Sequence, residues 1–277
     1  MPDDGESFRN LISETRSRPT RIFGSVYLDV LITGQTTTMS NKFRLAILLI
    51  TCIFPSFLLR PIYRYVFGYS IGKRVKFGLS IIDALECEIG DDVSIGHLNV
   101  FTGTKRLFIG DHCRIGHLNL FRGGNEINLG RFSEIVRFNE INSIPNPDVK
   151  NEYDPTFVLG DGAVVVASHK IDFTDRVQLG KRVILGGRHS SLWTHNRQST
   201  LPIVIGDNSY LGSEIRIAPG GGIPQNCVVG IGSVITKQLD GEYKLIAGVP
   251  AEVIKELDEE SRELVHYKTR PDLPDDI

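Results

Sequence analysis

Six aliphatic residues in the C-terminal half of the chain stand six positions apart. They are Ile205, Leu211, Ile217, Ile223, Val229 and Ile235. An α-helix would place its apolar residues every three or four positions, and an ordinary strand would alternate them every two. A period of six instead predicts a short strand followed by a corner. Three such units make one triangular coil of about eighteen residues.

A longer period contains this shorter one. Residues 89–101 and 109–121 both begin with Ile-Gly-Asp and both contain Ile-Gly-His-Leu-Asn, and the pattern returns from Leu129. We place the coil starts at Ile71, Ile89, Ile109, Leu129, Leu159, Leu179, Ile205 and Ile223. Stacked coils would form interior aliphatic ladders and join through parallel hydrogen bonds. The sequence therefore predicts an all-β fold, a parallel β-helix, with its glycines mainly at the corners.

Two intervals between coil starts are much longer than one coil. The interval from Leu129 to Leu159 is 30 residues and holds the Pro- and Asn-rich stretch 142–148. The interval from Leu179 to Ile205 is 26 residues and holds the stretch 193–202. Because loops on a rigid scaffold often carry binding and chemistry, we expect a functional site at one or both.

Polar residues recur ten positions after successive coil starts. They are Asn99, Asn119, Asn139, His169 and His189. Residues at equivalent positions of stacked coils lie in one column, so the three asparagines predict a ladder of side-chain hydrogen bonds. The two histidines leave two interpretations open, which are membership of the ladder and contact with a substrate from the neighbouring loop.

The N-terminal quarter of the chain has an uneven charge. No acidic residue occurs from Asn41 to Ile82, whereas seven basic residues do. The apolar run 45–59 is interrupted by Pro55 and is shorter than the roughly 20 residues that a spanning helix needs. It either caps the open end of the core or, with residues 42–76, lies against the inner face of an anionic membrane. Residues 1–40 are expected to be a loosely ordered leader, and Met39 is an alternative start.

Composition excludes several other classes of protein. With 31 Lys and Arg against 33 Asp and Glu, the chain lacks the basic character of a nucleic-acid-binding protein. Its four cysteines are scattered, which argues against a disulfide framework or a thiolate zinc site. We expect a cytoplasmic protein, peripheral at the membrane if the lead-in segment binds lipid. After Pro250 we expect a helix over the last coil, beginning at Ala251, and then a solvated acidic tail.

Several stretches of the second half of the chain resemble the hexapeptide-repeat acyltransferases. They are Leu192-Trp-Thr-His195 with the loop that follows it, Ile205-Gly-Asp-Asn-Ser-Tyr-Leu-Gly-Ser213, Ile217-Ala-Pro-Gly220 and Ala247-Gly-Val-Pro250. The chain is similar to the maltose and galactoside, xenobiotic, and colanic-acid and capsule O-acetyltransferases of that family. The resemblance implies a left-handed β-helix, acetyl-CoA as acyl donor, a carbohydrate acceptor and a homotrimer with sites between subunits. We divide the chain into 1–40 (leader), 41–68 (basic apolar helical segment), 69–250 (β-helix acyltransferase domain) and 251–277 (C-terminal helix and acidic tail).

The same resemblance assigns roles to particular residues. His195 corresponds to the catalytic base, and an imidazole suits this role because it titrates near neutral pH. Ser213 corresponds to the serine near the thioester. Residues expected to bind the cofactor are Tyr210, Gly220, Gly221, Gly230, Gly232 and Lys237, the glycines by their backbone amides. Residues expected to contact the acceptor are His169, Asp172 and Trp193. Asp172 and Glu214 are the candidates for an acid that orients His195, and no metal is expected.

Three other functions remain open from the sequence. The first is N-acylation of a nucleotide-linked amino sugar, because the base and the thioester would be the same. The second is a zinc-dependent hydratase like the β-helical carbonic anhydrases, for which His97, His112 and His117 are the candidate ligands. The third is a non-catalytic scaffold, against which the Trp-Thr-His loop argues.

Overall fold

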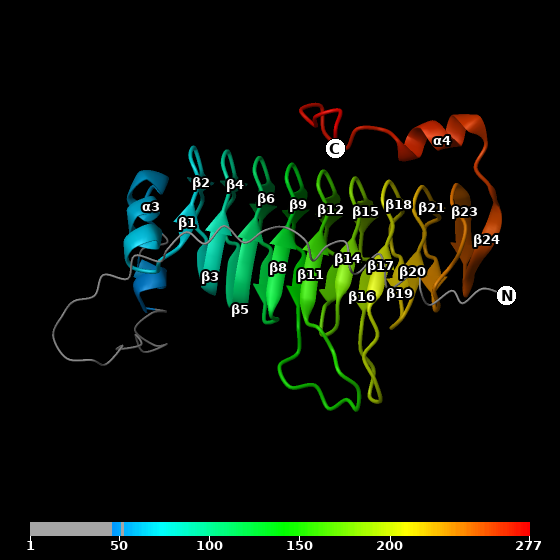
Figure 1. Cartoon of the computed structure of the whole chain (residues 1–277), viewed down its shortest axis with the longest axis horizontal. Coiled ribbons are helices and arrows are strands. Elements are labelled where there is room, and N and C mark those ends of the chain that lie inside the picture. The colour runs from blue at the N-terminus through cyan, green and yellow to red at the C-terminus, as the bar shows by residue number, and fades with distance from the viewer. Residues whose placement is uncertain (1–45, 51–52) are drawn as a thin grey trace. The chain divides into compact units, whose positions relative to one another are not determined.

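The computed structural model describes residues 46–50 and 53–277, and most of this length winds into a parallel β-solenoid (Figure 1). The chain divides into two units, Met1–Met39 and Ser40–Ile277, and every described residue belongs to the second. The predicted leader therefore lies outside the described residues. The prediction of an all-β fold with parallel coils is confirmed.

Each coil contributes strands to three faces of the solenoid. Face 1 contains β1 (Ser70–Ile71), β3 (Ile81–Ile89), β5 (Val100–Ile109), β8 (Glu126–Leu129), β11 (Thr156–Leu159), β14 (Val177–Leu179), β17 (Ile203–Ile205) and β20 (Gly222–Ile223). Face 2 contains β2 (Lys76–Phe77), β4 (Ser94–Ile95), β6 (Arg114–His117), β9 (Glu134–Arg137), β12 (Val164–Ala167), β15 (Ile184–Arg188), β18 (Tyr210–Leu211), β21 (Val228–Val229), β23 (Lys244–Gly248) and β24 (Ala251–Glu256). Face 3 contains β7 (Leu120–Arg122), β10 (Glu140–Asn142), β13 (Lys170–Asp172), β16 (Ser191–Trp193), β19 (Arg216–Ile217) and β22 (Val234–Ile235), together with the first residues of β3 and β5.

The predicted coil starts are the last residues of the face 1 strands. Each of the eight pairs in parallel with the next, from Ile71 with Ile89 through to Ile205 with Ile223. All eight side chains are buried, none with more than 4% of its surface exposed. The prediction of the coil starts is therefore confirmed, and the core is a set of aliphatic ladders inside the three faces.

Glycine follows most of these aliphatic residues because the next coil approaches too closely for a side chain. A Cβ atom on Gly90 would lie 2.3 Å from Asp111 Oδ1 and 2.8 Å from the Asp111 backbone nitrogen. Asp111 Oδ1 instead accepts a hydrogen bond of 2.6 Å from the backbone N–H of Asp91. The recurrent Gly-Asp pair thus combines a bare backbone on one coil with a side-chain acceptor from the next.

A column of buried polar residues runs through the coils where face 2 turns into face 3. Each member accepts a hydrogen bond from a backbone N–H of the next coil, in the order Ser80, Asn99, Asn119, Asn139, His169 and Ser190. The predicted asparagine ladder is confirmed, and it includes His169. The prediction that His189 belongs to the column is wrong. One extra residue in β15 shifts its register against β12 and places Ser190 there instead.

Both long intervals form loops at one corner of the solenoid, where face 3 turns into face 1. We call this the loop corner. The loop 143–155 follows β10, and the loop 194–202 follows β16. Figure 1 shows the two loops leaving the same edge of the coil stack. The two long intervals between coil starts therefore predicted the positions of both loops correctly.

A helix lies against the first coil at the N-terminal end of the stack. Residues 46–50 are helical, and α3 spans Ser56–Tyr65. Leu59 and Tyr63 of α3 are buried, and Arg60 Nη2 donates a hydrogen bond of 2.6 Å to the carbonyl of Val75. Phe57, on the other side of α3, is 72% exposed. Among the described residues, no helix is both long enough and apolar enough to cross a membrane.

The prediction of a helix beginning at Ala251 is wrong. Residues Ala251–Glu256 form β24, which pairs antiparallel with β23. The physical reason is the open edge of β23, whose backbone groups find partners in β24. The helix α4 (Glu259–Val265) begins later, and the Asp258 side chain caps its N-terminus by accepting a hydrogen bond from the backbone N–H of Ser261.

The prediction of a solvated tail is also wrong. After α4 the chain returns along the coils (Figure 1), and Arg270, Leu273 and Ile277 are buried. The guanidinium of Arg270 donates hydrogen bonds to the carbonyls of His112 and Phe132, at 2.9 and 3.1 Å. These contacts hold the tail against face 2 over the N-terminal half of the solenoid.

The asparagine ladder gives a test of what holds the coils in register. In Asn119→Ala, the N–H groups of Asn139 lose the acceptor Oδ1 and stay buried, so we expect a loss of about 3 kcal/mol in the free energy of unfolding. Urea denaturation followed by circular dichroism measures it. The matched control is Asn128→Ala, because Asn128 is only half-buried and bonds one neighbouring side chain. Equal stability of the two variants would contradict a structural role for the ladder.

Candidate active site

An imidazole and a carboxylate meet at the base of the 194–202 loop. His195 Nδ1 lies 2.5 Å from Asp172 Oδ2. Asp172 ends β13 on the preceding coil, and its side chain is 2% exposed. The His195 side chain is 23% exposed. When Nδ1 carries the proton shared with Asp172, Nε2 is left as a proton acceptor at the surface.

The neighbours of Asp172 fix its carboxylate in one orientation. Oδ1 accepts hydrogen bonds from the backbone N–H and the hydroxyl of Thr174, at 3.1 and 2.6 Å. Oδ2 accepts from the backbone N–H of Thr194 at 3.2 Å, in addition to its contact with His195. A buried carboxylate with this many donors is well compensated and has little freedom to move. Of the two candidate acids, Asp172 is the one that contacts His195.

The loop itself holds His195 in place through a tight turn. Asn196 Oδ1 accepts hydrogen bonds from the backbone N–H groups of Gln198 and Ser199, at 2.8 and 3.0 Å. Leu201 then donates its N–H to the carbonyl of Thr194. His195 and Thr200 face each other across this turn as an antiparallel bridge. The turn therefore begins and ends beside the imidazole.

The two long loops are bound to each other. Asn151 Oδ1 accepts a hydrogen bond of 2.9 Å from the N–H of Thr200, and Asn151 Nδ2 donates to the Thr200 carbonyl at 2.9 Å. Near the base of the same loop, Arg176 forms an ion pair of 2.7 Å with Asp154. The loop 143–155 thus braces the loop that carries His195. Sequence reasoning missed these contacts because the partners are distant along the chain and no motif marks them.

Some of the other predicted residues lie at the loop corner and some do not. Gly220, Gly221 and Lys237 lie at the loop corner on the coils after His195, and a Cβ atom on Gly220 would lie 3.1 Å from Leu201 Cδ1 of the loop. Trp193 precedes the loop, is 37% exposed and has Lys170 Nζ 5.3 Å from its ring.

A second group lies where face 2 turns into face 3, which we call the serine corner. Ser213 stands there against Gly187, where a Cβ atom would lie only 1.7 Å from Ser213 Oγ. Gly230 and Gly232 are at the same corner on the next coil, and Gly232 has a φ of 73°. Tyr210 lies on face 2 and is 42% exposed. Within one chain, the structure therefore does not bring Ser213 to His195.

Three of the four backbone amides predicted to line the cofactor channel already have partners inside the solenoid. Gly221 donates its N–H to Ala218, Gly230 to Ile246 and Gly232 to Ser213. At these three positions a ligand would find a surface without side chains rather than free N–H donors.

His169 is placed inside the solenoid rather than at its surface. It is 1% exposed, and its Nδ1 accepts a hydrogen bond of 3.1 Å from the backbone N–H of Ser190. Burial lowers the pKa of His169 to about 4. These features suit the ladder and leave no surface for contact with an acceptor.

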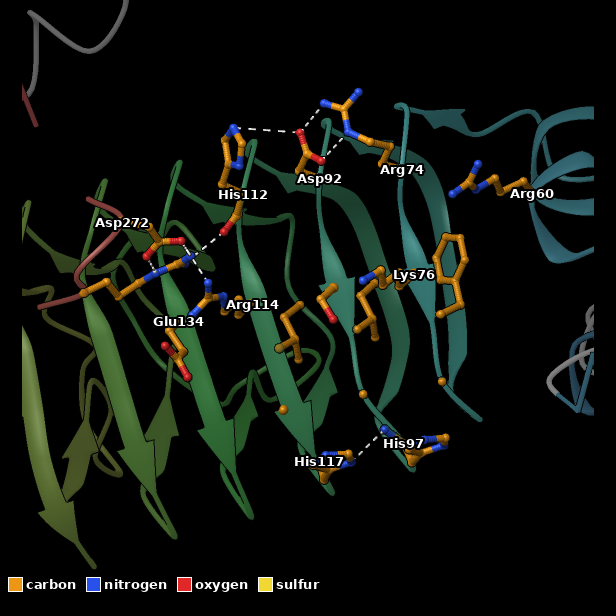
Figure 2. Close-up of a pocket in the computed structure, with 18 residues that line it drawn as sticks. Arg60, Arg74, Lys76, Asp92, His97, His112, Arg114, His117, Glu134 and Asp272 are labelled. Atoms are coloured by element: carbon orange, nitrogen blue, oxygen red, sulfur yellow. Dashed lines mark hydrogen bonds and ion pairs between the residues drawn. The ribbon is translucent and has the colours of Figure 1, made fainter. Parts of the chain in front are cut away.

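A further groove lies elsewhere, on face 2 beside α3. It has a volume of about 940 Å³ and is lined by Arg60, Arg74, Lys76, Asp92, Arg114 and Arg270 among others. Figure 2 shows the three candidate zinc ligands there, with His97 and His117 at one end and His112 at the other. The Nδ1 atoms of His97 and His117 each accept a hydrogen bond from a backbone N–H. In the described ranges, no group of three or more His, Cys, Asp or Glu residues is arranged to hold a metal ion.

Comparison with known proteins gives relatives among the acetyltransferases. The chain is 30% identical over 115 residues to the galactoside O-acetyltransferase of Escherichia coli K12, covering 40% of this chain and 55% of that protein. It is 30% identical over 122 residues to the putative colanic acid biosynthesis acetyltransferase WcaF of the same organism, covering 42% and 66%. No protein-family model matches the chain. The chain spans about half the length of the first of these relatives.

Among solved structures, the UDP-N-acetylglucosamine acyltransferase from Campylobacter jejuni aligns over 71% of this chain and 77% of its own, with a TM-score of 0.46 and 16% identity. The sequence relatives and the solenoid together support the resemblance to the hexapeptide-repeat acyltransferases.

The buried imidazole of His169 gives a test by pH. Because its pKa of about 4 lies below its ordinary value of 6.5, the unfolded chain binds a proton between these values that the folded chain does not. Above pH 6.5 the imidazole is neutral in both states and does not lower the free energy of unfolding. As the pH falls below 6.5, protonation of the unfolded chain lowers that free energy, by on the order of 3 kcal/mol at pH 4. We expect His169→Asn to keep the ladder and to flatten the dependence of the unfolding free energy on pH over this window.

Urea denaturation at several pH values measures this slope. The control is His266→Asn, which removes an exposed imidazole at the end of α4, away from His169. A slope in His169→Asn as steep as in the parent would contradict the assignment.

Proposed function

We propose that the chain is an acetyl-CoA-dependent O-acetyltransferase that acts on a sugar hydroxyl. The observation that carries this proposal is the pair of His195 and Asp172 in the braced loop, because a surface imidazole oriented by a buried carboxylate is suited to general base catalysis. The names of the sequence relatives support sugar O-acetylation, and WcaF supports a role in exopolysaccharide, capsule or lipopolysaccharide assembly.

The chemistry that we propose for His195 is a proton transfer in two directions. Acetyl-CoA supplies a thioester carbonyl as the site of attack. His195 Nε2 accepts the proton of the acceptor hydroxyl as its oxygen bonds to that carbonyl carbon, and the imidazolium returns the proton to the leaving sulfur. Asp172 keeps the proton on Nδ1 before the transfer and stabilises the imidazolium after it. Asp172 therefore acts as a positioning residue through His195.

A homotrimer of left-handed solenoids would complete this site. His195 lies at the loop corner and Ser213 at the serine corner, so the two can meet only between copies of the chain. In the trimer that the resemblance implies, the Ser213 hydroxyl of one copy would stabilise the developing oxyanion beside His195 of another. The exposed ring of Tyr210, the bare glycine surfaces and Lys237 would then line the path of CoA.

Variants of His195 and Asp172 test this mechanism. We expect His195→Ala to lower kcat/KM by at least about 100-fold, since a positioned general base contributes about that much or more. We expect Asp172→Asn to lower kcat by about tenfold or more while the KM for the sugar changes little, because the Asp172 side chain is only 2% exposed and would act through His195. Release of the CoA thiol, with a galactoside or an amino sugar as acceptor, measures both, and the alkaline lability of the product separates an O-acetyl ester from an N-acetyl amide.

The control for these measurements is His266→Gln, which alters an exposed imidazole at the end of α4, outside the proposed site. Circular dichroism checks that all three variants are folded. Activity of folded His195→Ala equal to that of the parent would refute the assigned base.

We further propose that the N-terminal end of the solenoid contacts an anionic membrane peripherally. Large apolar side chains around α3 are exposed, among them Ile53 at 67%, Phe57 at 72% and Tyr65 at 85%. The adjoining groove on face 2 carries Lys76, together with Arg74, which forms an ion pair with Asp92 (Figure 2). Apolar side chains beside cationic ones suit a surface of anionic lipids.

Sedimentation with vesicles tests this contact. The variant Ile53→Ser/Phe57→Ser removes two exposed apolar groups, and we expect its binding to phosphatidylglycerol vesicles to fall at least about tenfold. Phosphatidylcholine vesicles should bind the parent protein weakly. The matched control is Leu264→Ser, which alters a 65% exposed leucine of α4 at the other end of the chain. Binding that is the same for both variants would argue against the contact.

A further inference from the structure

A second cavity lies at the loop corner, on the coils before the one that carries Asp172. Its volume is about 790 Å³, and it opens beneath the base of the 143–155 loop. The lining residues are Thr102, Gly103, Lys105, Arg122, Gly123, Gly124, Asn125, Ser143, Ile144, Pro145, Asn146, Tyr153 and Pro155. This lining contains two cations and no carboxylate.

The two cations of this cavity have no partners among the described residues. Neither Lys105 nor Arg122 has a side-chain hydrogen bond or ion pair there, and both side chains are exposed. Two other arginines on the same solenoid are neutralised, in the pairs Arg106 with Glu126 and Arg131 with Asp161, at 2.8 and 3.0 Å. Two unpaired cations beside one cavity favour an anionic ligand, and the guanidinium suits a carboxylate or a phosphate in particular.

The remaining lining suits a sugar. Tyr153 is 38% exposed and offers an aromatic surface at the loop. Asn125, Ser143 and Asn146 add amide and hydroxyl groups that can bond sugar hydroxyls. Cavities that bind small molecules combine an aromatic surface with a few polar groups in this way.

The register of the strands relates this cavity to His195. Arg122 of β7 pairs with Asn142 of β10, which pairs with Asp172 of β13. Since neighbouring strands lie about 4.8 Å apart, Arg122 and Asp172 are separated along the stack by roughly 10 Å. The base of the 143–155 loop stands between them. A single sugar does not reach both places, but a short glycan chain along the edge does.

We propose that this cavity, which we call the anion pocket, binds an anionic group on the acceptor glycan. The group is a carboxylate or a phosphate, on a sugar one or two units from the one that is acetylated. Arg122 and Lys105 hold it, and the neighbouring sugar hydroxyl then lies toward His195. The position of the acetylated sugar rests on the proposed function, whereas binding of the anion does not.

The experiment therefore measures binding of the glycan and not its acetylation. Isothermal titration calorimetry is carried out with α-1,4-linked trigalacturonic acid and with the same trisaccharide after reduction of its carboxyl groups. We expect the acid form to bind at least about tenfold more tightly and to lose affinity as salt is added. A second pair of probes, α-galactose 1-phosphate and methyl α-galactoside, shows whether a phosphate is preferred to a carboxylate.

Three variants locate the binding. We expect Lys105→Gln/Arg122→Gln to abolish the preference for the acid trisaccharide and to leave binding of the reduced one unchanged. The matched control is Arg137→Gln, which removes an exposed arginine of β9 that lines neither cavity. His195→Ala should keep the preference for the acid over the reduced trisaccharide, because His195 does not line the anion pocket.

The outcomes separate this proposal from the enzymatic one. An anion preference that disappears only in the double variant supports the anion pocket, even where no acetyl group is transferred. Equal affinity of the acid and neutral probes, or a preference that survives in the double variant, overturns it. That result would leave the proposed acetylation of a neutral sugar, with His195 as the base, unaffected.

Discussion

Parallel hydrogen bonding between successive coils, in one unbroken register on face 1, is the constraint on which the rest of the structure depends. From Ile71 to Ile223, each coil places its aliphatic residue against the equivalent residue of the next. This register brings the backbones at Gly90 and Asp111 so close that no side chain fits between them. It also aligns the buried asparagines, so that each amide satisfies the backbone of the following coil. One residue added within a strand is accommodated by a local shift of register, as in β15, whereas the longer additions lie at a corner, where they leave the register of the strands unchanged.

The proposed chemistry follows from where those additional residues can go. Both long insertions occupy the loop corner, and Asn151 and Thr200 join them there. The solenoid supplies the rigid part of the site, since Asp172 is the last residue of a paired strand. The loop supplies the part that faces the solvent, since the turn after Thr194 returns His195 over that carboxylate. Rigid support beneath a short, braced loop is the arrangement that holds a base in a productive geometry.

What the sequence could predict depended on how far apart the interacting residues are. The coil starts, the asparagine ladder and both loops followed from a period that repeats many times. The pairing of His195 with Asp172 could not be singled out, because it depends on the direction in which the loop turns after β16. The strand β24 was missed because its partner, the open edge of β23, is a feature of the stack and not of residues 251–256. The buried tail was missed for a similar reason, since Arg270 bonds the carbonyls of His112 and Phe132 more than a hundred residues away.

The register also decides which parts of the proposed mechanism belong to one copy of the chain. Asp172 and His195 lie on adjacent coils at one corner, so a single solenoid contains the proton acceptor complete with its orienting acid. Ser213 lies at another corner of the same triangle, and stacking more coils cannot bring the two corners together. In the proposed mechanism, removal of the proton would therefore be a property of the monomer. Stabilisation of an oxyanion by Ser213 would be a property of the assembly, because only the serine corner of a second copy can reach the loop corner of the first.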